Sequence, residues 1–180
     1  MSEQILKIGI VTVSDRAARG EYADRGGPAI RSWLDAALIS AWSAEVRLVA
    51  DEQAHVAQTL RELVDEVGCQ LVLTTGGTGP AARDITPEAT LEVADKVLDG
   101  FGEKMRAISL QYVPTAILSR QVGVIRKSAL IVNLPGNPKA VAEILDDLFE
   151  VIPYTLELLE GPRVECDPAV LTAFRPKHAR

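Results

Sequence analysis

The chain has 180 residues, of which 47% are hydrophobic and 24% are charged, proportions that are typical of a folded globular protein and exclude a disordered or collagen-like one. Its net charge of −6 argues against non-specific binding to nucleic acid or to an anionic membrane. Two cysteines, Cys69 and Cys166, and two histidines are too few for a disulfide framework or a histidine-rich metal site. Any metal would therefore be held by oxygen ligands.

The N-terminal segment shows no targeting signal, because the apolar stretch 5–13 is interrupted by Lys7 and no basic residues precede it. No part of the chain approaches the ~18 consecutive apolar residues of a membrane span. The sequence also shows no internal repeat and no linker. We therefore expect a single cytoplasmic domain over residues 1–180 that binds neither membrane nor nucleic acid.

The first half of the chain alternates strand patterns with helix patterns. Strands are predicted at 5–13, 45–49 and 69–73, and the first of these is apolar enough to be buried on both faces. One helix is predicted to open near Pro28, with apolar residues at helical spacing behind it, and a second runs from about residue 51 to a stop at Gly68. This β-α-β-α-β order is typical of a mainly parallel sheet that is covered by helices.

The second half is less regular. Thr86-Pro87-Glu88 is predicted to begin a helix, with the threonine hydroxyl as N-cap and proline in the first turn. The remaining predicted elements are a helix at 102–111, short strands at 122–125 and 129–133 that would add an antiparallel member, a last helix from Pro138 interrupted at Pro153, and a surface tail over 165–180.

The glycine-rich segment Thr74-Thr75-Gly76-Gly77-Thr78-Gly79-Pro80, directly after the third strand, is the most informative motif. Its glycines allow a sharp turn and let backbone N–H groups approach an anion, although a plain connection without a ligand is the alternative. A Walker A loop is excluded, because Pro80 stands where lysine is required. Gly77-x-Gly79-x-x-Ala82 fits the dinucleotide fingerprint only formally, since it follows the third strand and Pro80 occupies the expected helix start.

Two carboxylates lie near this segment in the predicted topology. Asp84 follows it directly, and Asp51 follows the second strand. Carboxylates beside a phosphate loop suit Mg²⁺, which prefers oxygen ligands and shares its shell with phosphates and water. The alternatives are structural: Asp84 would fix its own loop through backbone N–H groups, and Asp51 would cap the following helix.

Two further polar clusters complete the pattern, Ser14-Asp15-Arg16 after the first strand and the turn 133–139 after the last one. All four clusters follow the carboxyl ends of predicted strands, and that edge of an open α/β sheet forms the ligand crevice. The sequence therefore predicts a site for phosphate and a polar heterocycle at this edge.

The ordered set of motifs resembles the molybdenum-cofactor biosynthesis domain, the molybdopterin-binding domain family. The motifs that carry the resemblance are 72–79 with Arg83-Asp84-x-Thr86-Pro87-Glu88, Ser14-Asp15-Arg16, Asp51-Glu52-Gln53, Ser119-Arg120 and Pro135-Gly136-Asn137-Pro138. The resemblance covers about residues 7–162. It implies a three-layer α/β/α sandwich whose mostly parallel sheet carries one antiparallel strand, and a homotrimer.

The resemblance also implies an activity: transfer of AMP from Mg-ATP to the terminal phosphate of molybdopterin, which gives adenylylated molybdopterin and pyrophosphate. The product would pass to a molybdenum-insertion protein. Asp51 and Asp84 would be the catalytic acids and, in this interpretation, the ligands of Mg²⁺. The remaining residues would contact the substrates: Ser14, Asp15, Thr75, Gly76, Gly77, Thr78, Gly79, Ser119, Arg120, Pro135, Gly136, Asn137 and Pro138.

Three other functions compete with this one. A domain of the same fold can bind molybdopterin without converting it, but the presence of both Asp51 and Asp84 favours an enzyme. A nicotinamide oxidoreductase would depend on the weak Gly77-x-Gly79 fingerprint. Insertion of metal into the pterin usually belongs to a longer, multidomain chain in this superfamily.

Overall fold

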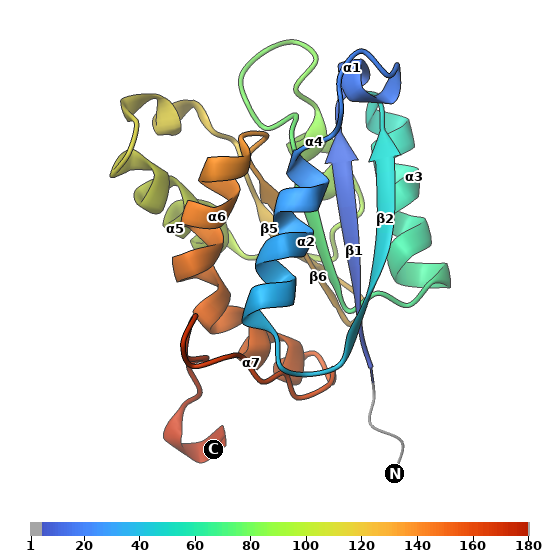
Figure 1. Ribbon diagram of the computed structural model, residues 1–180. Coiled ribbons are helices and arrows are strands. Elements are labelled where there is room, and N and C mark those ends of the chain that lie inside the picture. Colours follow the sequence, from blue (N-terminus) through green and yellow to red (C-terminus); the bar gives the residue numbers. More distant parts are fainter. Residues whose placement is uncertain (1–4, 180) are drawn as a thin grey trace.

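The computed structural model describes residues 5–179, which fold around one six-stranded sheet (Figure 1). The strand order is β2-β1-β3-β6-β5-β4. Neighbours among β2, β1, β3 and β6 are parallel, whereas β5 is antiparallel to both β6 and β4. The strands are β1 Leu6–Val13, β2 Trp42–Val49, β3 Leu71–Thr75, β4 Lys96–Val97, β5 Gly123–Arg126 and β6 Ala129–Leu134.

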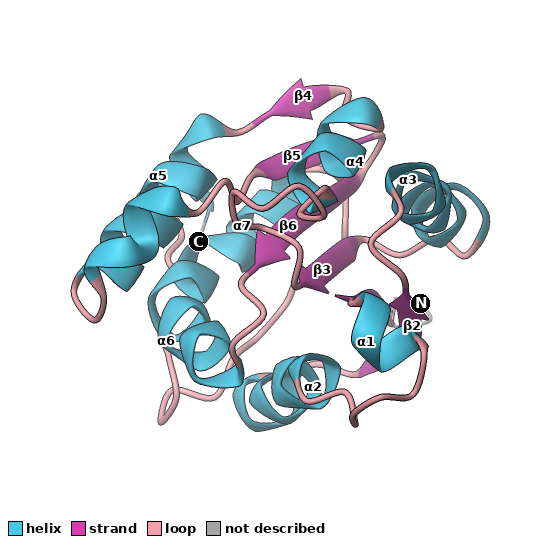
Figure 2. Cartoon of the chain, turned by 90° about the horizontal axis from the view of Figure 1, so that it is seen from above, coloured by secondary structure: helices cyan, strands magenta, loops and turns pink. Residues whose placement is uncertain are grey.

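Helices cover both faces of this sheet (Figure 2). One face carries α2, α5 and α6, which pack against one another, and the other carries α3 and α4, which form a second pair. The predicted three-layer α/β/α architecture with a single antiparallel strand is thereby confirmed. The helices are α1 Asp15–Ala18, α2 Gly26–Ala37, α3 Gln53–Arg61, α4 Thr86–Glu92, α5 Asp99–Leu110, α6 Pro138–Leu148 and α7 Ile152–Leu158, with a π-helical turn at Glu62–Glu66 and 3₁₀ turns at Pro114–Leu118, Phe149–Val151 and Lys177–Ala179.

The alternation of side chains along the strands explains the two layers of the core. Successive residues of a strand point to opposite faces, and in β1 Ile8 and Ile10 join the core under α2 and α6, whereas Val11 and Val13 join the core under α3. The central strand β3 divides in the same way. Because both faces are buried, these strands contain almost no polar residues until their carboxyl ends.

The start of α2 differs from the prediction by two residues. The helix begins at Gly26, because the Asp24 carboxylate accepts hydrogen bonds from the N–H groups of Gly26 and Gly27 at 3.0 and 3.3 Å. A Cβ at Gly26 would lie 2.7 Å from the side chain of Thr75. The glycine therefore allows the beginning of α2 to pack directly against the end of β3.

Two predictions concern the C-terminal end. The interruption at Pro153 is confirmed, since α6 ends at Leu148 and α7 begins at Ile152. The surface tail is confirmed for most of its described residues, which are exposed or half-buried, but Cys166 is buried beside Leu38 and Arg175 is buried with its guanidinium bonded to Glu157 at 2.6 and 2.8 Å. The tail packs on the rest of the domain through a few apolar residues and one ion pair. These residues show no hydrophobic period, so the sequence does not predict their burial.

No helix among the described residues is both long and apolar enough to cross a membrane.

Candidate functional site

The polar clusters predicted from the sequence meet at one edge of the sheet. The carboxyl ends of the parallel strands β1, β2, β3 and β6 lie there, and so do the beginnings of α2 and α6 (Figure 1). The loop that follows β3, residues 76–85, stands above this edge. Loops at the carboxyl ends of strands form the usual ligand crevice of an open α/β sheet.

Two pockets open at this edge. We call them the Asp51 pocket, with a volume of about 490 Å³, and the Ser119 pocket, with a volume of about 520 Å³; both volumes are in the range of small-molecule sites. The Asp51 pocket is lined by Thr12, Val13, Ser14, Arg16, Tyr22, Asp24, Arg25, Gly26, Asp51, Thr75, Gly76, Gly77, Asp84, Gly136 and Pro138. The Ser119 pocket is lined by Thr78, Gly79, Pro80, Ser109, Tyr112, Val113, Thr115, Ala116, Leu118, Ser119, Gln121, Pro135, Asn137, Lys139, Ala140 and Glu143.

The two pockets share one wall, made of the glycine loop (residues 74–80) and the turn at 135–138. Residues 75–77 of the loop line the Asp51 pocket, and residues 78–80 line the Ser119 pocket. The turn is divided in the same way, with alternate residues on each side. A phosphate on this wall would be reachable from both pockets.

Glycine is required at two positions of the wall. Gly76 has φ +95° and Gly77 has φ +65°, values in the left-handed region that favours glycine. A Cβ at Gly76 would run into the Val13 carbonyl oxygen, and a Cβ at Gly77 would run into the Thr86 hydroxyl and lie 3.1 Å from Asp51 Oδ1. The backbone therefore approaches the strand ends and an acidic side chain closely.

Thr86 does not cap α4 as the sequence suggested. It is the first residue of the helix, and its hydroxyl donates to the Gly76 carbonyl oxygen at 2.9 Å. Its backbone N–H donates to the Gly77 carbonyl oxygen at 3.1 Å. Thr86 thus holds the glycine loop through these two hydrogen bonds. Its hydroxyl is used in this tertiary contact instead of capping α4.

Asp51 is bonded to the first residue of α1, Asp15, and not to the helix that follows Asp51. Its Oδ2 accepts the N–H of Asp15 at 2.7 Å, and its own N–H donates to Asp15 Oδ1 at 3.0 Å. The N-cap of α3 is Glu52, without a side-chain cap bond. The alternative interpretation of Asp51 as a helix cap is therefore wrong.

The pKa values of Asp51 and of its partner Asp15 are shifted in opposite directions. Burial raises the pKa of Asp51, and the negative charges of Asp15 and Asp84 add to this, against the lowering effects of the Asp15 N–H and of Arg83. Burial also acts to raise the pKa of Asp15, but the Asp51 N–H and the bonded Arg83 guanidinium outweigh it and hold the pKa below the ordinary value. A cation near Asp51 would relieve the repulsion among these carboxylates.

Arg83 connects the long loop to this pair of acids. Its Nε and Nη2 donate to the two carboxylate oxygens of Asp15 at 2.8 and 2.9 Å, and Nη2 also donates to Glu52 at 3.1 Å. This bidentate pairing gives a fixed geometry. The Arg83 charge also lowers the pKa of Asp51, against the raising effects of burial and of the neighbouring carboxylates.

We predict that Arg83→Gln moves the acid limb of the kcat profile to higher pH. The resemblance assigns a cation to Asp51, and only the ionised carboxylate can bind it. Because burial already raises the pKa of Asp51, the carboxylate is lost as pH falls through that value. Removing the Arg83 charge raises the pKa further. The measurement is kcat against pH at saturating substrates, with Arg83→Lys as the charge-retaining control; an unchanged limb in Arg83→Gln would contradict the prediction.

Asp84 lies across the Asp51 pocket. Its Oδ2 accepts the N–H of Ala81 at 3.0 Å, so the carboxylate does fix its own loop, as the structural alternative proposed. The same side chain lines the pocket and acts electrostatically on Asp51. The structural interpretation of Asp84 is therefore confirmed, and its role as a catalytic acid and metal ligand stays a prediction.

The residues present fit Mg²⁺ that arrives with a substrate. No group of three or more His, Cys, Asp or Glu side chains gathers as a metal site within residues 5–179, so a resident ion with an all-protein shell is not indicated. Mg²⁺ commonly uses one or two carboxylates and completes its octahedron with water and substrate phosphates. Asp51 and Asp84, in one pocket beside the glycine loop, supply that number of ligands.

Arg120 lies in neither pocket. Its guanidinium donates to the carbonyl oxygens of Gly79 (2.8 Å) and Asp84 (2.5 Å) and forms a close ion pair with Glu88. That bond to Arg120 holds the pKa of Glu88 below its ordinary value. The structure thus places Arg120 as a support of the loop that carries Asp84, and its contact with a substrate stays a prediction.

The hydrogen bonds of Ser119 orient its hydroxyl. Gln121 is 1% exposed, and its amide nitrogen donates to the Asn133 carbonyl oxygen at 3.1 Å and faces the Met105 sulfur at 3.6 Å. Its amide oxygen therefore accepts, and Ser119 Oγ must be the donor of the bond between them. Because a hydroxyl has only one proton, Ser119 can act toward the pocket only as an acceptor.

The sequence interpretation missed several lining residues. Gln121, Tyr112 and Arg25 belong to the pockets, yet none stands in a motif that marks a site. The aspartate, arginine and two glycines at 24–27 are the one signal that could have indicated Arg25, since polar residues in loops on a rigid scaffold commonly carry function. Nothing in the sequence marked Gln121.

Comparison with known proteins agrees with the geometry. The family model for a probable molybdopterin binding domain matches residues 9–154. A relative from Escherichia coli K12 is named molybdopterin adenylyltransferase and is 58% identical over 97% of this chain and 96% of its own length. A Helicobacter pylori J99 relative with the same name is 49% identical over 97% of this chain and 99% of its own.

Solved structures of molybdopterin biosynthesis proteins are also similar to this chain. The molybdopterin biosynthesis enzyme MoaB from Thermus thermophilus superposes with a TM-score of 0.81 at 41% identity and covers 88% of this chain and 99% of its own. The molybdopterin biosynthesis Mog protein from Mycobacterium ulcerans gives a TM-score of 0.79 at 38% identity over 86% of this chain and 99% of its own.

Proposed function

The chain belongs to the molybdopterin-binding domain family and transfers an adenylyl group to molybdopterin, and we propose that it holds Mg-ATP in the Asp51 pocket and molybdopterin in the Ser119 pocket. The observation that carries this proposal is the shared wall. The glycine loop and the 135–138 turn separate the pockets, so the α-phosphate of ATP and the phosphate of molybdopterin would meet on the same backbone.

The carboxylates that line the Asp51 pocket favour it as the site of the nucleotide. A carboxylate beside a phosphate repels it unless a cation intervenes, and the pocket is lined by three carboxylates, Asp24, Asp51 and Asp84. Mg-ATP brings its own cation. Burial raises the pKa of Asp51, and the charges of Asp15 and Asp84 raise it further; a bound Mg²⁺ would lower it.

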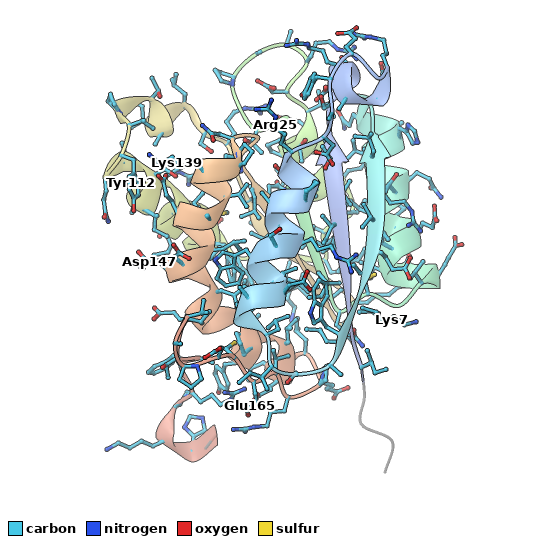
Figure 3. All side chains as sticks on the ribbon, viewed as in Figure 1. Lys7, Arg25, Tyr112, Lys139, Asp147 and Glu165 are labelled. Atoms are coloured by element: carbon cyan, nitrogen blue, oxygen red, sulfur yellow. The ribbon has the colours of Figure 1, made fainter. Side chains whose placement is uncertain are left out.

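The Ser119 pocket suits a polar heterocycle with a phosphate. Its wall includes the apolar and aromatic side chains of Tyr112, Val113 and Leu118, which can contact the faces of a ring system. Ser119 presents an acceptor to the N–H groups that a pterin carries. Lys139, at the first turn of α6 and with only a 3.7 Å contact to Glu143, would receive the phosphate (Figure 3).

The chemical step needs little covalent chemistry from the protein. A phosphate oxygen of molybdopterin attacks the α-phosphorus of ATP, and the bond from that phosphorus to the bridging oxygen breaks, so that its electron pair leaves on pyrophosphate. Backbone N–H groups of the glycine loop would hold the reacting phosphates in line. Mg²⁺, when bound on Asp51 and Asp84, supplies neutralisation of the triphosphate charge.

The test is pyrophosphate release on mixing the protein with molybdopterin and Mg-ATP. Release that requires both substrates supports the proposal. Molybdopterin binding without release would indicate a binding module of the same fold, and a fluorescence change with NADH would indicate the nicotinamide alternative.

We also propose that the protein is a homotrimer. Two exposed apolar side chains lie outside both pockets, at the end of α5 and in the turn after it: Leu110 is 44% and Ile117 is 69% exposed, and exposed apolar surface commonly marks interfaces. Sedimentation equilibrium at micromolar concentration should therefore show three times 19.4 kDa; a single species at 19.4 kDa would contradict it. The cytoplasmic location and the hand-over to a molybdenum-insertion protein stay predictions.

A further inference from the structure

The Arg25 side chain differs from that of every other arginine in residues 5–179. Each of the others makes an ion pair or a hydrogen bond with the chain, and the Arg25 guanidinium makes neither. A guanidinium carries five donors in a planar fork that matches phosphate geometry. An arginine without a partner on the wall of a pocket is therefore available to a ligand.

The backbone places Arg25 beside the glycine loop. It is the residue directly before α2 and lines the Asp51 pocket together with Asp51 and Asp84. The next residue, Gly26, packs against Thr75 at the end of β3 so closely that a Cβ would lie 2.7 Å away. Figure 3 shows Arg25 at the upper end of α2, at the edge of the sheet where the loop after β3 lies.

The acids around Arg25 already have partners. The Asp24 carboxylate accepts the Thr12 hydroxyl at 2.8 Å as well as the N–H groups that begin α2. Asp51 and Asp15 are bonded to each other's backbone. No internal bond therefore competes for the Arg25 side chain.

The other cation of the pocket is committed elsewhere. Arg16 pairs with Glu21 at 3.5 Å and lies over the ring of Tyr22, with its guanidinium carbon 5.0 Å from the ring centre. Arg25 is consequently the one lining cation, among the described residues, without a bond to the protein. An ATP with four negative charges would face three carboxylates and one guanidinium without a protein partner. A metal on the acids would neutralise part of the phosphate charge, and Arg25 would supply further positive charge.

We propose that Arg25 binds the β- and γ-phosphates of ATP and stabilises the pyrophosphate as it leaves; this assignment rests on the proposed placement of ATP in the Asp51 pocket. The α-phosphate must lie at the shared wall, where it meets molybdopterin. The rest of the triphosphate then extends into the Asp51 pocket. When the bond between the α-phosphorus and the bridging oxygen breaks, its electron pair goes to that oxygen, and the negative charge increases on the group that Arg25 contacts.

The experiment compares Arg25→Gln with Arg25→Lys and with the control Arg31→Gln, which removes a cation from α2 outside the pocket. Calorimetry measures the affinities for AMP, ATP and inorganic pyrophosphate in the presence of Mg²⁺. Arg25→Gln should weaken ATP and pyrophosphate by about 10- to 100-fold, the usual effect of losing a charged hydrogen bond, while AMP stays within about twofold. Arg25→Lys should lose less, because it keeps the charge but not the bidentate fork.

The pyrophosphate concentration that half-inhibits turnover should rise in parallel in Arg25→Gln. Arg31→Gln should match the parent in all of these values. The melting temperature of Arg25→Gln should also match the parent, because the side chain has no partner to lose.

Two results would overturn the assignment. Unchanged ATP and pyrophosphate affinities in Arg25→Gln would mean that Arg25 touches no phosphate, and an equal loss for AMP would place it on another part of the nucleotide. If the parent protein itself bound no Mg-ATP, the proposed function would fail first and this assignment with it. The parent and variant arms therefore separate the two failures.

Discussion

Asp84→Asn and Asp51→Asn are each expected to lower the turnover of adenylyl transfer by about 10²-fold or more, while the affinity for molybdopterin holds or rises. Single preorganised electrostatic groups are commonly worth ~3 kcal/mol in a transition state. Asparagine keeps the shape of the side chain, and its amide oxygen can still accept the Asp15 N–H that Asp51 accepts at 2.7 Å. Only the charge that would hold Mg²⁺ is removed.

The division between the pockets explains the expected molybdopterin affinity. Both acids line the Asp51 pocket and neither lines the Ser119 pocket, so their removal takes away a repulsive charge without removing a contact to the pterin. The measurement is molybdopterin affinity and turnover on the same preparations. Asp147→Asn is the control, because that exposed carboxylate lies on α6 away from the site (Figure 3).

Two outcomes would contradict this assignment of the acids. If molybdopterin affinity fell in step with turnover, the acids would belong to the pterin site. If turnover survived in both variants, Asp51 and Asp84 would only hold their loops, through the Asp15 and Ala81 N–H groups that they accept.

Gly77→Val is expected to abolish the binding of ATP and of molybdopterin in a chain that still folds. Valine resists the φ of +65° at this position, and its Cβ would collide with the Thr86 hydroxyl and press on Asp51. The loop would have to move, and the wall that both pockets share would lose its shape. The measurement is the affinity for each substrate, with circular dichroism as the check on folding.

Gly68→Val is a matched control for backbone strain. Gly68 has a similar φ of +79°, and a Cβ there would meet nothing within 4 Å. Both variants carry a left-handed non-glycine residue, which costs about 1–2 kcal/mol, but only Gly77→Val obstructs the site. If Gly77→Val bound both substrates like the parent, the glycine loop would be a mere connection; should valine prevent folding, Gly77→Ala makes the same test with a smaller side chain.

The parts of the fold that could be predicted are those set by local pattern. β1 and β3 are apolar because both faces are buried, and this pattern predicts the parallel sheet and its layers correctly. β4, with two residues, is too short to show any period. The predicted span of β3 lies two residues early, because the last residues of the strand are threonines that look like loop but are 0–1% exposed.

The parts of the site that directly follow strands could be predicted from the sequence. The directions of the side chains within the site could not. The glycine loop, Asp51 and Asp84 follow strands, so topology alone brings them to one edge. The bond that orients Asp51 comes from Asp15, 36 residues away, which is why a local cap was the natural alternative. The two pockets and the roles of Arg25 and Gln121 depend on side-chain directions that no spacing in the sequence encodes.

A crystal structure of the protein with ATP and Mg²⁺ would show directly which pocket holds the nucleotide. We predict phosphates on residues 75–79 of the glycine loop, the metal on Asp51 and Asp84, Arg25 on the β- and γ-phosphates, and the Ser119 pocket free for molybdopterin. A nucleotide bound in the Ser119 pocket, or one whose phosphates do not touch the glycine loop, would contradict this prediction.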